Sequence, residues 1–189
     1  MEKQIEYSIQ FFSHWHTGSG LSGGAYADAI VIKNSDGFPF IPGKTIKGLL
    51  HHAALEINRF NSAKVDSTFT KHFFGREGYE SQSFQTFFSD ATLSQSLANQ
   101  LKELGEASRN VLYETISATQ IDEGGQAAVG SLRQMEITVP ITLFGSIYTN
   151  ESFDLSKLKA CLSFIKCLGL NRNRGLGRCD FKLITQKGL

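Results

Sequence analysis

The sequence contains no apolar run that approaches the roughly 20 residues of a membrane-spanning helix. Its first ten residues also lack the apolar segment of a signal peptide. Cysteine is scarce: Cys161, Cys167 and Cys179 are an odd number and lack the CxxC spacing of redox and zinc motifs. These absences predict a cytoplasmic protein with reduced thiols in its core and no membrane partner.

Nucleotide-binding motifs are also missing. In a phosphate-binding P-loop that ended at Lys44-Thr45, the first glycine would stand at Phe38, and Pro39 and Pro42 would remove N–H donors. Residues 175–180 lack the third glycine of a dinucleotide fingerprint and precede a predicted strand instead of a helix. The sequence therefore does not support a nucleoside triphosphatase or a dinucleotide-dependent enzyme.

Positive charge is concentrated near the C-terminal end, although the formal net charge is only +1. Residues 157–189 contain eight Lys or Arg and one Asp, a local charge of +7. The remaining eleven basic and seventeen acidic residues give residues 1–156 a charge of −6. This asymmetry indicates an anion-binding face, and the alternative is an ordinary solvated helix face followed by a basic tail.

Hydrophobic periodicity predicts several strands and two amphipathic helices. The helices are expected from about residue 44 to 60 and from 155 to 168. Strands are expected at residues 5–11, 27–32, 83–91, 111–121, 135–147 and 179–183. Because residues 122–130 are polar and rich in glycine, a long hairpin at about 113–135 is expected to project from the core. The order of elements predicts an α+β sandwich of the ferredoxin-like kind, with an insertion at about 61–108.

Two groups of basic residues are candidates for binding an anion. Lys44 and Lys47 stand in the first turn of a predicted helix, where the helix dipole disfavours cations and a bound anion would compensate. Three glycines are interspersed with three arginines in residues 169–178, and such a backbone can approach a polyanion. The arginines of this loop are Arg172, Arg174 and Arg178. Guanidinium groups bind phosphates in a forked geometry or stack on bases.

His16 and Asp28 flank a glycine-rich loop that follows the first predicted strand. His14 and His16 have the spacing of a metal pair, but no third ligand is suitably placed. A polar contact to RNA or an ordinary histidine at a strand end are the other interpretations of His16. Asp28 is either an ordinary edge residue or, if it faces RNA, a carboxylate that binds a metal or orients a 2′-hydroxyl.

Four segments together resemble the RAMP superfamily of CRISPR effector proteins, and within it the backbone subunits of type III complexes. They are residues 16–20, Asp28 with residues 37–49, residues 121–122 and 127–133 with Glu136, and residues 169–178. The second and fourth segments are the most specific. Lys44-Thr45 departs from the family, which usually has a pair of serines there.

The resemblance implies a modified RNA-recognition-motif domain over residues 1–189 that stacks along a CRISPR guide RNA with copies of itself or related subunits. His16, Arg133 and the lysines and arginines named above are expected to bind RNA, and the hairpin is expected to act as a thumb that wedges between bases. In catalytic members, an aspartate before the proline-glycine motif cuts complementary target RNA with a divalent metal, expected to be Mg²⁺. Asp28 matches that aspartate. Two alternatives stay open: a non-catalytic scaffold of the same effector complex, and a guide-processing endoribonuclease that uses His16.

Overall fold

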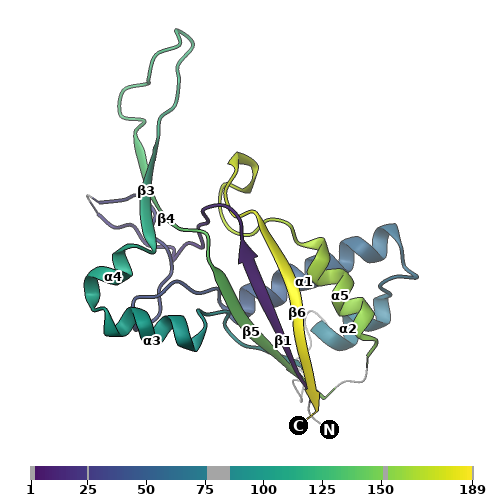
Figure 1. Cartoon of the computed structure of the whole chain (residues 1–189). Helices are drawn as coiled ribbons and strands as arrows, with labels where there is room; N and C mark the ends of the chain where they lie inside the picture. The colour runs from purple at the N-terminus through teal and green to yellow at the C-terminus, as the bar shows by residue number, and fades with distance from the viewer. Residues whose placement is uncertain (1–2, 25, 76–85, 151–152, 189) are drawn as a thin grey trace.

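The centre of the molecule is a four-stranded antiparallel sheet (Figure 1). The structure is a computed structural model that describes residues 3–24, 26–75, 86–150 and 153–188. The strands of the sheet are β1 (Lys3–Phe11), β2 (Thr86–Phe88), β5 (Thr142–Thr149) and β6 (Cys179–Gly188), and they lie in the order β2-β5-β1-β6. Ile5 of β1 lies opposite Ile147 of β5, and Ile9 lies opposite Phe181 of β6.

Helices pack against one face of this sheet (Figure 1). They are α1 (Gly43–Phe60) and α5 (Leu155–Phe164), with α2 (Ser67–Phe74) beside α1. Side chains alternate along β1, so Ile5, Tyr7 and Ile9 are fully buried, whereas Glu6 and Ser8 lie on the opposite face. Burial of each aliphatic side chain of this kind stabilises the fold by about 1.5 to 3 kcal/mol.

The order of elements and the order of strands define the fold class. Along the chain, the central elements run β1-α1-β2-β5-α5-β6, and β1 lies between β5 and β6 in the sheet. This is the ferredoxin-like arrangement. The predicted α+β class is therefore confirmed.

A long segment between β2 and β5 leaves the central sheet. It contains α3 (Gln95–Glu103), α4 (Glu106–Asn110), β3 (Tyr113–Ala118) and β4 (Arg133–Thr138). The last two strands form a separate two-stranded antiparallel sheet whose hairpin projects far from the body (Figure 1). The projecting hairpin is thus present, and its second strand continues to Thr138. By contrast, α2 lies within the predicted insertion at 61–108, yet its Phe69 and Phe73 are part of the main core.

Several predicted elements differ in their bounds. Residues 27–32 form only isolated bridges, because Val31 pairs with Gly18 on one side and Ala29 pairs with Met135 on the other. The predicted strand at 135–147 is two strands, separated around Pro140, which has no N–H to donate to a ladder. The second helix ends at Phe164 because Ile165 is already extended. Of the strand predicted at 83–91, the structure describes residues 86–91 and shows β2, while 83–85 lie outside the described residues.

The cysteines are free thiols; Cys161 and Cys179 are buried, as predicted, whereas Cys167 is partly exposed. Burial raises the thiol pKa of Cys161 to about 12, and that of Cys179 also to about 12, so both stay protonated near neutral pH. Within the described ranges, no helix is long and apolar enough to cross a membrane.

Candidate nucleic-acid interface

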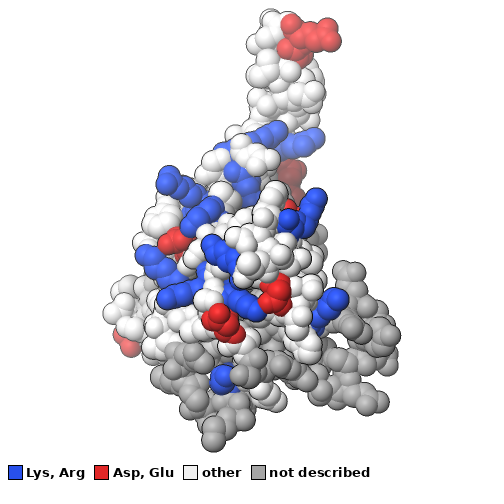
Figure 2. All heavy atoms as spheres, turned by 90° about the vertical axis from the view of Figure 1, so that its right-hand side faces the viewer, with Lys and Arg blue, Asp and Glu red and all other residues white. Residues whose placement is uncertain are grey.

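Exposed cations gather on the side of the molecule formed by α5, β6 and the loop between them. We call this surface the basic face, and its exposed members are Lys159, Lys166, Arg172, Arg174, Arg178 and Lys182. Figure 2 shows Lys and Arg side chains spread over this side, below the projecting hairpin. Asp180 approaches two of these cations, at 3.2 Å from Lys166 Nζ and 4.0 Å from Lys182 Nζ. In the described part of the chain, no carboxylate lies within ion-pair distance of the three arginines.

The arginine loop, residues 169–178, is anchored to the segment that follows β1. The N–H of Leu170 donates to the carbonyl of His16 at 2.9 Å, and the N–H of Gly177 donates to that of His14 at 2.7 Å. A Cβ at Gly177, whose φ is +73°, would lie 1.9 Å from the Leu168 carbonyl oxygen. Gly177 therefore allows close packing within the chain, a role different from the predicted one of bringing the backbone close to a polyanion. The one-turn 3₁₀ helix Arg172–Arg174 presents two of the arginines to solvent.

His16 lies beneath this loop and is only 1% exposed. Its Nδ1 is 2.6 Å from the carbonyl oxygen of Glu136, and a Cβ at Gly18 would lie 3.1 Å from its Nε2. The ring thus contacts β4 and its own loop, while the arginine loop packs against the His16 backbone, where a Cβ at Gly169 would lie 2.3 Å from the carbonyl oxygen. In this structure His16 offers almost no surface to RNA. Sequence reasoning had no means to foresee this burial, because β4 and the arginine loop are far away in the sequence.

Lys44 and Lys47 lie on the first turn of α1, as expected, but this turn already has an anionic partner. The N–H of Gly43 donates to Asp90 Oδ1 at 2.8 Å, so a carboxylate of the same chain occupies the helix N-terminus. A Cβ at Gly43 would lie 2.0 Å from the Phe88 carbonyl oxygen, which explains the glycine. The lysine turn lies beside the end of β2, and three strand spacings, about 14 Å, separate β2 from β6 at the opposite edge of the sheet. The structure therefore does not bring the lysines and arginines into one cluster.

Asp28 lies at the base of the projecting hairpin. Its N–H donates to the carbonyl of Gln134 at 2.8 Å, and its Oδ2 accepts from the N–H of Gln134 at 2.8 Å. The side chain is otherwise exposed, and the neighbouring Arg133 is exposed at the first position of β4. Two predicted site residues, Asp28 and Arg133, are thus held beside each other.

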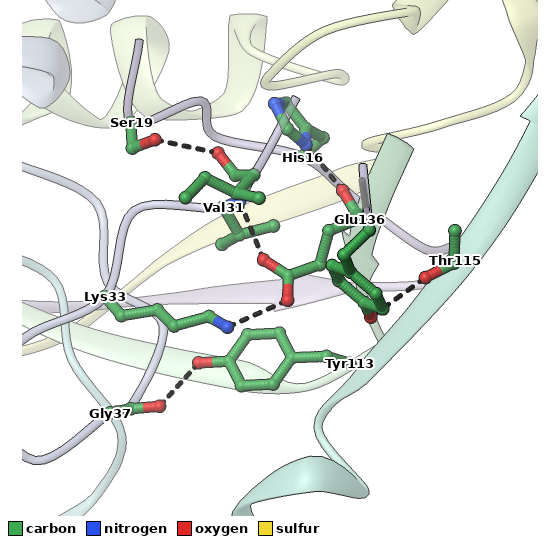
Figure 3. Close-up of polar contacts among 10 residues, drawn as sticks. His16, Ser19, Val31, Lys33, Gly37, Tyr113, Thr115 and Glu136 are labelled. Carbon is green, nitrogen blue, oxygen red and sulfur yellow. Dashed lines mark hydrogen bonds and ion pairs between the residues drawn. The ribbon is translucent and has the colours of Figure 1, made fainter. Parts of the chain in front are cut away.

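A buried ion pair fixes this arrangement (Figure 3). Glu136 is 3% exposed; its Oε1 is 2.8 Å from Lys33 Nζ, and its Oε2 accepts from the N–H of Val31 at 3.0 Å. Lys33 Nζ also lies 3.9 Å from the centre of the Tyr113 ring, and the Tyr113 hydroxyl donates to the carbonyl of Gly37 at 2.7 Å. Burial, with a smaller contribution from the Glu136 charge, raises the pKa of Tyr113, so its hydroxyl remains a donor. These contacts fasten the segment that carries Asp28 to both strands of the hairpin.

Sequence reasoning did not identify Lys33, and it included Glu136 only as part of the resemblance. A detectable signal existed: Glu136 stands between Met135 and Ile137 in an apolar strand. A buried carboxylate requires a partner. The sequence does not say which cation supplies it.

The described residues around Asp28 provide few ligands for a metal ion. Among the described residues, no group of three His, Cys, Asp or Glu side chains is placed to hold a metal ion. Asp28 supplies a single carboxylate, one oxygen of which already accepts a hydrogen bond. Mg²⁺ requires about six oxygen ligands, so the chain alone does not meet its needs.

Comparison with known proteins identifies the family to which this chain belongs. The profile of the RAMP superfamily matches residues 8–180, so the chain belongs to the RAMP superfamily. The structure is similar to a chain of the cryo-EM structure of type III-B Cmr-beta bound to cognate target RNA, with a TM-score of 0.70 and 13% identity over 95% of this chain and 96% of that one. It is also similar to a chain of type III-B Cmr-beta in the apo state, with a TM-score of 0.70 and 14% identity; the match covers 96% of this chain and 97% of that one. The comparison with curated proteins gave no match.

Proposed function

We propose that this chain is a backbone subunit of a type III CRISPR effector complex and binds the guide RNA on its basic face. The observation that carries the proposal is the set of exposed arginines that have no carboxylate partner among the described residues and are held on a firmly anchored loop. Membership of the RAMP superfamily and the fold shared with chains of Cmr-beta support it. Complementary target RNA, other effector subunits and further copies of this chain are the partners that the proposal implies.

The salt dependence of RNA binding tests this proposal. Affinity of the purified chain for a single-stranded RNA of guide length is expected to fall linearly on a log–log plot against salt, because phosphate contacts release counterions. Replacing Arg172, Arg174 and Arg178 together by alanine should reduce the slope by about 2, since each phosphate contact on a single strand contributes about 0.7.

The control for this experiment is Lys102→Ala. Lys102 is also exposed, but it lies on α3, away from the basic face, where it pairs with Asp36. We expect this variant to leave the slope unchanged. A triple-arginine variant with the wild-type slope would contradict the proposed binding face.

We further propose that Asp28 serves cleavage of the paired target RNA. The 2′-hydroxyl of a target nucleotide would attack the adjacent phosphorus, form a cyclic phosphate and release the 5′-oxygen, with Asp28 accepting the hydroxyl proton and water protonating the leaving oxygen. The exposure of Asp28 at the hairpin base supports this role. A divalent ion, expected to be Mg²⁺, would take most of its ligands from RNA phosphates and water, because the chain supplies one carboxylate.

Two substitutions separate the charge of Asp28 from its structural hydrogen bond. In Asp28→Asn the side-chain oxygen still accepts from the N–H of Gln134, whereas Asp28→Ala removes both the bond and the charge. In the assembled complex, both variants should lose target cleavage and retain guide binding. Asp154→Asn is the control, because Asp154 is also exposed and accepts from a backbone N–H, that of Ser156, but lies at the N-terminus of α5. Cleavage at the wild-type rate by Asp28→Asn would exclude a catalytic carboxylate.

A non-catalytic scaffold is the second candidate, and the pairing of Asp28 with Gln134 favours it, because that contact gives the carboxylate a structural role. The scaffold predicts the same RNA binding without magnesium-dependent cleavage in the assembled complex. The burial of His16 counts against a guide-processing nuclease that uses this residue.

A further inference from the structure

A pocket of about 520 Å³ opens beside the basic face at the end of β1. It is lined by Phe12, Lys166, Cys167, Arg178, Cys179 and Asp180. Phe12 is the residue directly after β1, and 51% of its surface is exposed. A large aromatic side chain thus stands in solvent among cations of the basic face, and the proposed function assigns it no contact.

The strand register explains why these side chains converge. Phe11 pairs with Cys179, and the N–H of Phe12 donates to the carbonyl of Arg178 at 2.8 Å. Directly opposed residues on antiparallel strands direct their side chains to the same face, so Phe12 and Arg178 are cross-strand neighbours. Phe11 and Cys179 are buried toward the helices. Because side chains alternate along a strand, Phe12 and Arg178 lie on the opposite, open face of the sheet.

The pocket also contains hydrogen-bonding groups. Asp180 follows Arg178 by two residues, which places it on the same face. Its Oδ1 is 3.2 Å from Lys166 Nζ, so both signs of charge meet at the edge of the pocket. A flat ring, a guanidinium group, a carboxylate and an ammonium group therefore border one pocket.

We propose that this pocket binds a single nucleobase of the RNA, stacked on Phe12; the inference rests on the proposed function and names a contact within it. Arg178 would lie on the base or its phosphate, and Asp180 would accept a hydrogen bond from an N–H group of the base. Stacking on an exposed aromatic ring tolerates any sequence, because every base has a π-face. Such a contact suits a subunit that must hold guides of different sequence.

Substitution of Phe12 tests the site in the full chain with a single-stranded RNA of guide length. Phe12→Ala should weaken binding by about 5- to 150-fold, the equivalent of one lost stacking contact. The salt slope should stay unchanged, because no charge is removed. Phe12→Trp should bind as well as the wild type, since it keeps an aromatic face. Phe60→Ala is the control, because Phe60 is also exposed, at 81%, but lies at the C-terminal end of α1.

The possible outcomes separate this site from the proposed function. If the wild-type chain binds no RNA, the proposed function fails and the site fails with it. If the wild type binds RNA and Phe12→Ala binds as well as Phe60→Ala, only the nucleobase site is excluded. Photo-crosslinking of the wild-type chain to RNA that contains 5-iodouracil gives an independent result that requires no variant. We expect a crosslink at Phe12 by mass spectrometry, and crosslinks that avoid Phe12 would overturn the assignment.

Discussion

Lys33 and Glu136 form an ion pair with unequal burial. The side chain of Glu136 is 4% exposed and that of Lys33 is 34% exposed. Removing one member of a buried pair leaves the other charge uncompensated, and the cost depends on how far that charge is from water. The pair therefore connects the hairpin to the segment that carries Asp28, and the two partners are not equivalent.

This asymmetry gives a prediction for stability. Lys33→Met leaves a buried carboxylate without its cation and should lower the free energy of unfolding by about 3 kcal/mol. Glu136→Gln retains an acceptor for the N–H of Val31 and leaves a partly hydrated ammonium group, so it should cost only about 1 kcal/mol. Urea denaturation of both variants and of the double variant measures the difference. A Lys33→Met variant as stable as Glu136→Gln would contradict the account of the pair.

At the scale of elements, the arginine loop and the hairpin are held by contacts to residues far away in the sequence. The arginine loop is bonded to the segment after β1, and β4 is bonded to residues 28–31. Neither anchor is visible in the local sequence of the element. Hydrophobic periodicity predicted both helices and the hairpin, because the spacing of apolar residues in a helix or a strand is a property of the local sequence. It failed for residues 27–32, whose extended shape depends on two different neighbours.

The glycines of the arginine loop provide a prediction at this scale. Gly175 and Gly177 both have positive φ, +88° and +73°, but only Gly177 is enclosed, with Leu168 against it. Gly175→Ala should therefore cost only the conformational penalty of about 1 kcal/mol. Gly177→Ala should cost more and displace Arg178, so RNA affinity should fall.

Thermal unfolding and RNA titration of the two variants test this expectation. Gly175→Ala is the matched control, because it has the same backbone requirement without the contact. Equal effects of the two substitutions on stability and affinity would show that the close packing at Gly177 does not position the arginines.

For the whole molecule, the sequence was sufficient to predict the ferredoxin-like order of elements, the projecting hairpin and the basic C-terminal third. It was insufficient for contacts that depend on tertiary packing. His16 is buried where β4 and the arginine loop meet its own loop, and the anionic partner of the α1 N-terminus is Asp90; all of these partners are far away in the sequence. The exposure of Phe12 was also hidden, because an aromatic residue at the end of a strand is ordinarily part of the core.

The most direct test of the central claim is the RNA that the chain retains when it is purified from its own cells with its complex. If the chain is a guide-binding backbone subunit, the bound RNA should be of uniform guide length, and its amount should fall in the triple-arginine variant. Sequencing the extracted RNA measures both properties. A complex that forms normally but carries no RNA, or carries only fragments of random length, would contradict guide binding.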